Sequence, residues 1–306
     1  MGDTATRGRA TTRRQGETGK SDDARRGDRA TRGRSLRVPE SARPGVSASR
    51  VPTSSSLTGP ESPPPTWTLP HGWRLHYLPI TGSTNDDARD LALAGSPERT
   101  VVLADEQRAG RGRLGRLWLA PRGSSLLFSI VLRRALEAIH CTAACSVAVT
   151  EAVEQITSLK PRIKWPNDVM VRDLKVCGVL TEVLTHGGRK AAIVGIGLNV
   201  NLDPEDAGLP ATATSLAHEC GTVLSRAAVL RAILERLDAY LALDDAALGA
   251  TVQTRWESLL WRRWQEVQID QSGASLSGVV EGLAPSGALL IRTAGGVVEV
   301  AVADVS

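Results

Sequence analysis

The stretch from Gly110 to Trp118, GRGRLGRLW, combines two kinds of residue that suit phosphate and carboxylate binding. Glycines let the backbone bend and approach a ligand closely, and arginines supply planar cationic donors. Arg111, Arg113 and Arg116 lie so near one another that the empty loop repels itself. We therefore expect a mobile lid that becomes ordered when a phosphate-bearing ligand binds beneath it.

A dinucleotide-binding turn is the first alternative, because GRGRLG also fits the pattern G-x-G-x-x-G. That turn needs a helix directly after it, so that the helix N-terminus faces a pyrophosphate. The residues after Gly115 instead form a strand-like run that Pro121 interrupts, and Glu137, the nearest candidate for a ribose-binding acid, begins a helix. The sequence disfavours this interpretation. From this stretch alone, a solvated, arginine-rich surface turn remains a second alternative interpretation.

A second group of chemically useful residues is KWPND, Lys164–Asp168. Pro166 restricts Trp165 to extended conformations, which predicts a turn at the end of a short strand. The amide of Asn167 can face a purine or a backbone group. Asp168 can pair with a lysine or bind Mg²⁺ through oxygen, although an Asp–Lys pair is usually an ordinary surface contact.

Lysine is scarce in this chain, with five lysines against 32 arginines, yet four of the five fall between positions 160 and 190. One of them, Lys175, begins the strand after KWPND. Gly178 follows three residues later and leaves room where backbone approaches a ligand. The clustering directs attention to this region as part of the same site.

The charge of the chain is unevenly placed. Its net charge is +4, and residues 1–50 alone carry +7, so the remainder carries −3. The folded part therefore gives no reason to expect general nucleic-acid binding. A non-catalytic nucleic-acid binder that uses the basic tail is retained as an alternative of another class.

The cysteines and the apolar runs point to a cytoplasmic location. None of the four cysteines forms a C-x-x-C pair or lies at metal-ligand spacing beside a histidine, so we expect buried, reduced thiols. No apolar run approaches the ~18 residues that span a bilayer. The N-terminus also lacks the apolar core of a signal peptide.

The elements that must position these residues follow from periodicity. Residues 1–66 are rich in Arg, Ser, Thr, Gly and Pro and are predicted to be a disordered tail. Residues 67–262 are predicted to form a mixed α/β domain, and 263–306 a small all-β domain. The predicted strands of the larger domain are 73–80, 100–106, 125–132, 162–171, 176–184 and 191–200. The predicted helices are 84–94, 136–158, 226–243 and 247–262.

Five motifs occur together in one order. They are STN at 83–85, Q-x-x-GRGR-x-GR-x-W at 107–118, KWPND at 164–168, K-x-x-G at 175–178 and GIGLNVN at 195–201. In this order and spacing the chain resembles the biotin–protein ligase family, in its form without an N-terminal DNA-binding domain, over about residues 75–262. The resemblance implies an α/β (α+β) catalytic domain with a mixed sheet, related to class II aminoacyl-tRNA synthetases. It also implies an SH3-like C-terminal β-barrel.

The resemblance further implies an activity. Family members adenylate biotin with ATP and Mg²⁺ to give biotinyl-5'-AMP. They then transfer biotin to one lysine of a biotin carboxyl carrier domain in an acyl-CoA carboxylase. A homodimer through the catalytic sheet is compatible with the resemblance, whereas specific DNA binding and a membrane partner are not expected.

Residue roles are carried over by matching motif. The implied catalytic residues are Lys175, Arg111 and Arg113. The implied biotin-binding residues are Ser83, Thr84, Asn85, Gln107, Arg111, Gly112, Arg113, Lys175 and Gly178. The implied ATP-binding residues are Gly110, Arg113, Trp118, Lys164, Asn167, Asp168 and Asn199, and Asp168 is also the implied Mg²⁺ ligand.

Two points qualify the resemblance. A lipoate–protein ligase of the same fold is the nearest alternative, and KWPND and GRGR favour biotin over it. Leu114 stands where some relatives carry a basic residue, which predicts modestly altered contacts between loop and ligand.

Overall fold

The structure is a computed structural model that describes residues 67–134, 136–271 and 274–305. By their contacts these residues all belong to one unit, Pro60–Ser306. The tail predicted for residues 1–66 lies outside the described residues.

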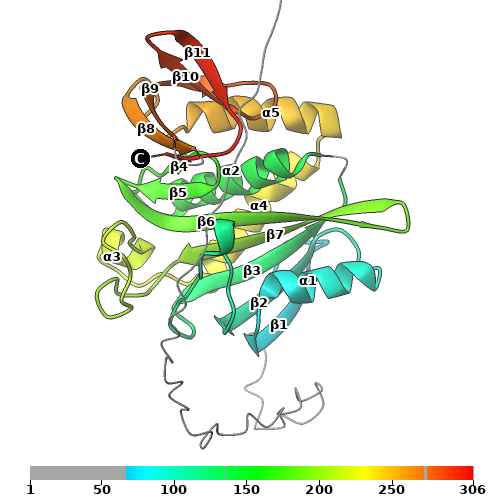
Figure 1. The fold of residues 1–306 in the computed structure, drawn as a ribbon. Coiled ribbons are helices and arrows are strands. Elements are labelled where there is room, and N and C mark those ends of the chain that lie inside the picture. Colours follow the sequence, from blue (N-terminus) through cyan, green and yellow to red (C-terminus); the bar gives the residue numbers. More distant parts are fainter. Residues whose placement is uncertain (1–66, 135, 272–273, 306) are drawn as a thin grey trace, which may run out of the picture. The chain divides into compact units, whose positions relative to one another are not determined.

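A seven-stranded mixed sheet forms the centre of the larger part, in the order β1-β2-β3-β7-β6-β5-β4 (Figure 1). Only β1 and β2 are parallel to each other, and all other neighbours are antiparallel. The mixed α/β prediction is thus confirmed. The strands are β1 (Arg74–Thr81), β2 (Thr100–Gln107), β3 (Ser125–Leu132), β4 (Arg162–Lys164), β5 (Asp168–Val171), β6 (Leu174–His186) and β7 (Arg189–Asn199).

Helices cover both faces of this sheet. On one face, α2 packs against strands of the sheet and against α4 and α5. On the other, α1 packs on β2, β3 and β7. Neighbouring residues of β2 point to opposite faces of the sheet: Val101 joins the core under α2, and Val102 joins the core under α1. The helices are α1 (Thr84–Leu93), α2 (Ala138–Ile156), α3 (Leu216–Cys220), α4 (Arg226–Leu241) and α5 (Asp245–Ser258).

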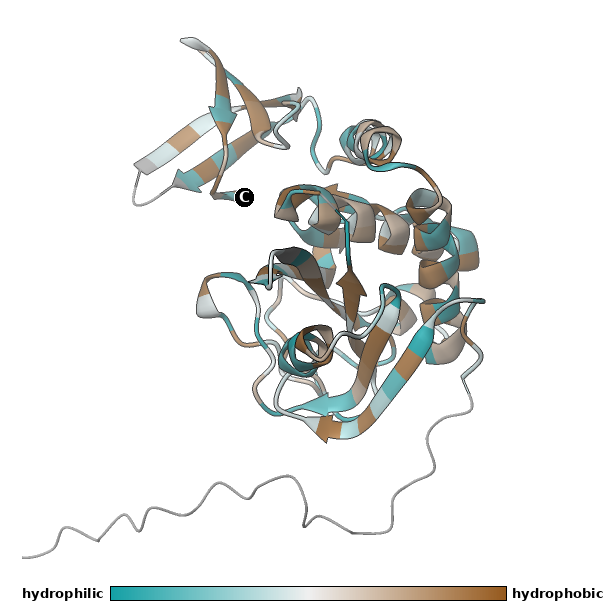
Figure 2. Ribbon diagram, turned by 90° about the vertical axis from the view of Figure 1, so that its right-hand side faces the viewer, coloured by the Kyte–Doolittle hydropathy of each residue, from teal (hydrophilic) through white to brown (hydrophobic). Residues whose placement is uncertain are grey.

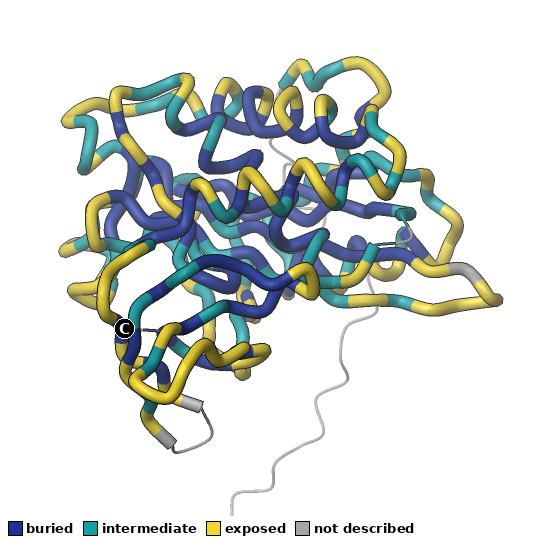
Figure 3. The backbone as a smooth tube through the Cα atoms, turned by 90° about the horizontal axis from the view of Figure 1, so that it is seen from above, coloured by how far each residue is buried: buried dark blue, intermediate teal, exposed yellow. Residues whose placement is uncertain are grey.

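Burial follows the hydrophobic pattern of the sequence. Every residue of β3 is buried, as its continuous apolar run predicts. Figure 2 shows hydrophobic residues running along the strands, and Figure 3 shows the buried segments in the middle and the exposed ones in peripheral turns. No helix among the described residues is long and apolar enough to cross a membrane.

The turn predicted at Trp165–Pro166 is present, but the strand predicted over residues 162–171 is not continuous. The segment forms two short antiparallel strands, β4 and β5, joined by a turn at Trp165–Asn167. Pro166 has no N–H group and so cannot donate a hydrogen bond to a neighbouring strand. The backbone oxygen of Asn167 accepts a hydrogen bond from the Val179 N–H of β6.

The predicted end of the last helix at residue 262 is also wrong, because α5 ends at Ser258. The backbone beyond it pairs with β4: Ile163 N–H donates to the Leu259 carbonyl, and Trp261 N–H donates to the Ile163 carbonyl. Arg262 then adopts a left-handed conformation with φ 53°, which a helix cannot contain.

The C-terminal part is a five-stranded antiparallel sheet in the order β11-β10-β9-β8-β12. It confirms the predicted small all-β part, although the last short strand was not predicted. Trp165 donates its indole N–H to the Gly287 carbonyl at 2.9 Å, which ties this sheet to the KWPND turn. The strands are β8 (Glu266–Gln271), β9 (Ala274–Leu283), β10 (Leu289–Thr293), β11 (Gly296–Val300) and β12 (Asp304–Val305).

Phe128 is fully buried on β3, between Leu103 on β2 and Ile196 on β7. We expect Phe128→Ala to lower the free energy of unfolding by about 3–5 kcal/mol, because the truncated side chain leaves a cavity. Urea denaturation followed by circular dichroism measures this. Val298→Ala, at a side chain 40% exposed on β11, serves as the control and is expected to change stability by less than about 0.5 kcal/mol. Equal losses in the two variants would contradict the assignment of the core.

Candidate functional site

A cavity of about 770 Å³ lies against the sheet and brings the separate motifs together. Its wall includes the 110–119 segment, the start of α1, β5, β6, the end of β7 and residues from β12. Of the predicted site residues, all except Gly110 line it. The lining ones are Ser83, Thr84, Asn85, Gln107, Arg111, Gly112, Arg113, Trp118, Lys164, Asn167, Asp168, Lys175, Gly178 and Asn199.

Residues 110–118, which we call the lid, form a narrow hairpin over this cavity. The Trp118 N–H donates to the Gly110 carbonyl at 2.9 Å and closes its base. A side chain at Gly110 would collide with the Trp118 carbonyl, so this glycine permits the closure. The tip is a single 3₁₀ turn, Arg113–Gly115, in which Leu114 has φ 57°. No helix follows the lid before β3, which excludes the dinucleotide interpretation.

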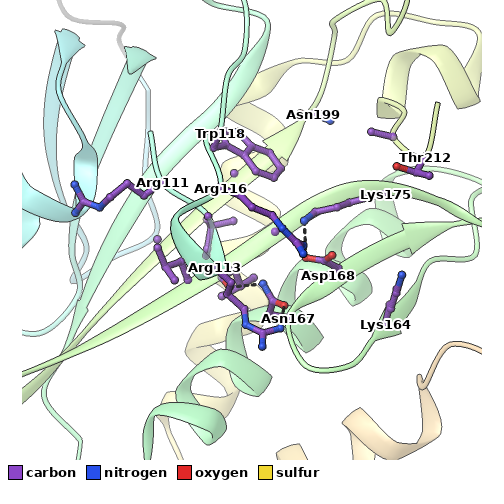
Figure 4. A pocket seen from close by; sticks show the side chains of 18 of the residues that line it. Arg111, Arg113, Arg116, Trp118, Lys164, Asn167, Asp168, Lys175, Asn199 and Thr212 are labelled. Carbon is purple, nitrogen blue, oxygen red and sulfur yellow. Dashed lines mark hydrogen bonds and ion pairs between the residues drawn. The ribbon is translucent and has the colours of Figure 1, made fainter. Parts of the chain in front are cut away.

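Arg111 points away from the other labelled side chains of the cavity (Figure 4). Its guanidinium makes a bidentate pair with Asp86, at 2.7 and 2.6 Å, and lies 3.7 Å from Glu182. The hydrogen bonds from Arg111 hold the pKa of the Asp86 carboxyl below its usual value, so this carboxylate stays ionised to lower pH. The charge of Arg111 is thus already matched by protein carboxylates.

The other two lid arginines take separate partners. Arg113 donates to the Asn167 side-chain oxygen at 3.1 Å, and Arg116 makes an ion pair with Asp304 on β12. The lid is therefore tied at once to the KWPND turn and to the C-terminal sheet. In this structure the three arginines do not share one anion.

The floor beneath the lid carries the other central cation. Lys175 Nζ lies 2.6 Å from Asp168 Oδ1 and 5.4 Å from the centroid of the Trp118 ring. The indole rests on backbone of β6 and β7, where side chains at Gly178 or Gly197 would meet it. These glycines thus make room for Trp118 in the empty site, in addition to any room they leave for a ligand.

Lys164 lies on the far wall, with its ammonium 5.1 Å from the centroid of the Trp261 ring. Burial lowers the pKa of Lys164, and the nearby Asp168 partly opposes that effect. Arg262 stacks on the same ring at 4.2 Å. This wall therefore presents two cations held against one aromatic ring.

Neutral polar groups gather at the opposite end of the cavity. Thr84 donates its backbone N–H and its hydroxyl to the Gln107 side-chain oxygen, at 2.8 and 3.0 Å. The buried hydroxyl of Ser129 lies 2.7 Å from the Thr84 hydroxyl and donates to the Asn85 oxygen at 2.6 Å. Gly195 gives the Asn85 amide its space, because a side chain there would overlap it. This end offers hydrogen bonds without net charge.

The two remaining predicted amides are engaged with backbone. Asn167 donates its NH₂ group to the Val179 carbonyl at 3.0 Å, and Asn199 donates to the Thr214 carbonyl at 3.0 Å. The Asn199 side-chain oxygen is buried without a hydrogen-bond partner among the described residues. The residue itself lines the cavity.

Several lining residues were not predicted from the sequence. They include Leu209, Thr212, Ala213, Trp261, Arg262, Asp304 and Val305, with Ser129 supporting the amide end. Ser129 had a signal, since it is the one polar residue inside the apolar run LLFSIVL. The residues after position 200 had none, because only the fold brings them to the cavity.

The carboxylates near the cavity do not form a resident metal site. Among the described residues, no group of three or more His, Cys, Asp or Glu side chains is placed to hold an ion. Asp168, the predicted Mg²⁺ ligand, is paired with Lys175. Its role toward a metal stays a prediction.

Gly197 is the position where Trp118 packs most closely on the sheet. We expect Gly197→Ala to drive the indole off the floor, because a methyl group forced into a packed contact costs about 1–3 kcal/mol. Acrylamide quenching of tryptophan fluorescence measures it, with the same substitution in a Trp118→Phe background giving the contribution of the other tryptophans. Gly249→Ala on α5, where an added methyl meets nothing within 4 Å, is the control. If acrylamide quenched Trp118 equally in Gly197→Ala and in the Gly249→Ala control, the contact between Trp118 and Gly197 would not be tight.

Comparison with family models agrees with this geometry. Residues 77–201 match the model of the biotin/lipoate A/B protein ligase family, and residues 265–306 match that of the biotin protein ligase C terminal domain. The two matches cover the cavity-forming strands and the C-terminal sheet.

Relatives and solved structures agree as well. The bifunctional ligase/repressor BirA of Bacillus subtilis is 32% identical over 241 residues, 76% of this chain and 74% of that protein. The biotin–[acetyl-CoA-carboxylase] ligase of Paracoccus denitrificans is 34% identical over 226 residues, 70% of this chain and 92% of that one. The structure of the Aquifex aeolicus biotin protein ligase in complex with biotin and ATP superposes with a TM-score of 0.66 at 32% identity, covering 76% of this chain and 97% of that one. The chain belongs to the biotin/lipoate A/B protein ligase family.

Proposed function

We propose that this chain is an ATP-dependent biotin–protein ligase, which makes biotinyl-5'-AMP and transfers biotin to a lysine of a carrier domain. One observation carries the proposal: a single cavity has a neutral amide and hydroxyl end and a cationic end, beneath an arginine lid. Relatives named as biotin–[acetyl-CoA-carboxylase] ligases, and a related structure with biotin and ATP bound, support it.

The neutral end favours biotin over lipoate. The biotin head group is a cyclic urea, with two N–H donors and one carbonyl acceptor. Thr84, Asn85, Gln107 and Ser129 offer hydroxyl and amide partners of both kinds. The dithiolane of lipoate has no such groups and would gain no hydrogen bond from these side chains, so this end discriminates against it.

The cationic end suits adenylation. The biotin carboxylate oxygen attacks the α-phosphorus of ATP, an acyl–phosphate bond forms, and the bond to the leaving pyrophosphate breaks. Both reactants are anionic, so cations fixed near the α-phosphate stabilise the transition state. We propose that Lys175 lies between the carboxylate and the α-phosphate and that Arg113 covers them. No covalent enzyme intermediate is required, because positioning and charge supply the effect.

The remaining roles follow the same logic. Trp118 would pack on the adenine, and Lys164, Asn167, Asp168 and Asn199 would surround the nucleotide. Mg²⁺ would enter with ATP as part of the substrate. In the second step the carrier lysine amine attacks the acyl carbonyl and AMP leaves.

The partner and the domain division are also part of the proposal. The acceptor is a biotin carboxyl carrier protein or domain of an acyl-CoA carboxylase. The proposed division is a tail over 1–66, a catalytic domain over 67–262 and an SH3-like domain over 263–306. Asp304 and Val305 line the cavity, so the last domain contributes to the site. All four cysteines are free, which fits the proposed cytoplasmic location.

The function is tested by incubating the full chain with ATP, biotin and an isolated biotin carrier domain. We expect the carrier to gain the mass of one biotinyl group at a single lysine, and a Lys→Arg carrier at that position to gain none. Thermal shifts with biotin plus ATP and with lipoate plus ATP separate the two acids. Stabilisation by lipoate alone, with no carrier modification by biotin, would refute the proposal.

Lys175 is the residue expected to matter most for the first step. We expect Lys175→Ala to slow pyrophosphate release by about 10²–10³-fold, the usual loss when one preorganised electrostatic group is removed. Lys160→Ala removes a lysine that is 71% exposed and paired with Glu154 outside the cavity, and should leave the rate unchanged. A Lys175→Ala rate within a few fold of the Lys160→Ala rate would remove Lys175 from the chemistry.

A further inference from the structure

Two carboxylates outside the predicted site, Asp86 on α1 and Glu182 on β6, both face Arg111 of the lid. We call this pair the acidic socket. The contact with Asp86 is bidentate, which fixes the plane of the guanidinium as well as its position. Bidentate pairs within a network are the exception to the general weakness of exposed ion pairs.

Glu182 is shared between the lid and the neutral end of the cavity. One oxygen lies 3.7 Å from Arg111, and the other accepts hydrogen bonds from Arg89 at 3.2 Å and from the Asn85 amide at 3.3 Å. The oxygen of Asn85 accepts from Ser129. The Asn85 amide is therefore held at both ends, with its NH₂ group directed to Glu182.

We propose that the acidic socket anchors the lid through Arg111, and that Glu182 also fixes the orientation of the Asn85 amide at the neutral end of the cavity. Asp86 and Glu182 are then positioning residues, which act through Arg111 and Asn85 and do not touch the reacting atoms. The claim about the lid stands on the ligand-free geometry. The effect expected on biotin binding rests on the proposed function.

The socket changes the role assigned to Arg111. Its guanidinium is turned away from Lys175 and Asp168 (Figure 4), and it already has a matched carboxylate. Moving it to a ligand would leave Asp86 without this partner. Arg113 and Arg116 are bound by one neutral amide and one exposed carboxylate, so they are the arginines that a phosphate can take over. Arg111 is the fixed end of the lid and these two form its moving end.

Limited proteolysis with trypsin reports how often the lid opens, because trypsin cleaves after arginine and needs a locally unfolded segment. In the ligand-free full chain we expect Asp86→Asn to speed cleavage after Arg113 and Arg116 by about three- to tenfold, since cleavage follows the population of the open form. Cleavage after Arg111 itself is left out, because the substitution frees that side chain directly. Peptide masses over time give the rates at each arginine.

Asp90→Asn is the matched control, because Asp90 lies on the same helix and carries the same charge but makes no contact with Arg111 in the described structure. We expect trypsin to cleave this variant at the wild-type rate. Asp86→Glu should restore most of the protection, since it restores the charge. Melting temperatures near that of the wild type show that the fold is intact. Equal cleavage rates for Asp86→Asn and Asp90→Asn would overturn the anchoring role.

Biotin kinetics separate the two carboxylates. Asp86→Asn should release biotinyl-5'-AMP faster and leave the KM for biotin near the wild-type value. Glu182→Gln should do both, releasing the adenylate faster and raising the KM for biotin, because Asn85 loses its orientation. An unchanged KM in Glu182→Gln would refute the link to Asn85. If the wild type makes no adenylate at all, the proposed function fails, while the trypsin result still decides the anchoring role.

Discussion

Charge compensation in an empty anion site is the constraint on which the rest of this structure depends. Lys164, Lys175 and three lid arginines surround one cavity, and their mutual repulsion would open it without partners. Each has one. The partners are Asp168 for Lys175, Asp86 and Glu182 for Arg111, Asn167 for Arg113, Asp304 for Arg116 and the Trp261 ring for Lys164. The cations are thus preorganised before an anionic substrate arrives.

These partners differ in how readily a ligand can displace them. A bidentate carboxylate holds Arg111 firmly, whereas a single amide bond holds Arg113. The contacts of the lid arginines thus weaken from Arg111 at its base to Arg113 at its tip. An anionic ligand can therefore displace the contact at the tip more readily than the contact at the base.

The floor of the cavity imposes a second constraint, of space. Backbone of β6 and β7 lies under the Trp118 ring because Gly178 and Gly197 carry no side chains, and Gly195 does the same for Asn85. The opposite wall is completed by Trp261 and Arg262, which lie between α5 and β8, and by Asp304 of the C-terminal sheet. The small sheet is therefore part of the site, and the turn bond from Trp165 to Gly287 fixes it there.

The sequence by itself determined most of the elements, and nearly all of the site residues that it predicted line the cavity. Long apolar or periodic runs such as 125–132 predicted their strands and helices closely, because burial and local propensity agree there. The motifs placed fourteen of fifteen predicted residues on one cavity. Only the tertiary structure decided their partners. Arg111 meets Asp86 and Arg116 meets Asp304 across 25 and 188 residues of chain, because the fold brings α1 and β12 beside the lid. The turn at KWPND was predicted, whereas the pairing of the strands on either side of it and the end of α5 were not, because backbone partners from distant segments, rather than local propensity, fix where those elements stop.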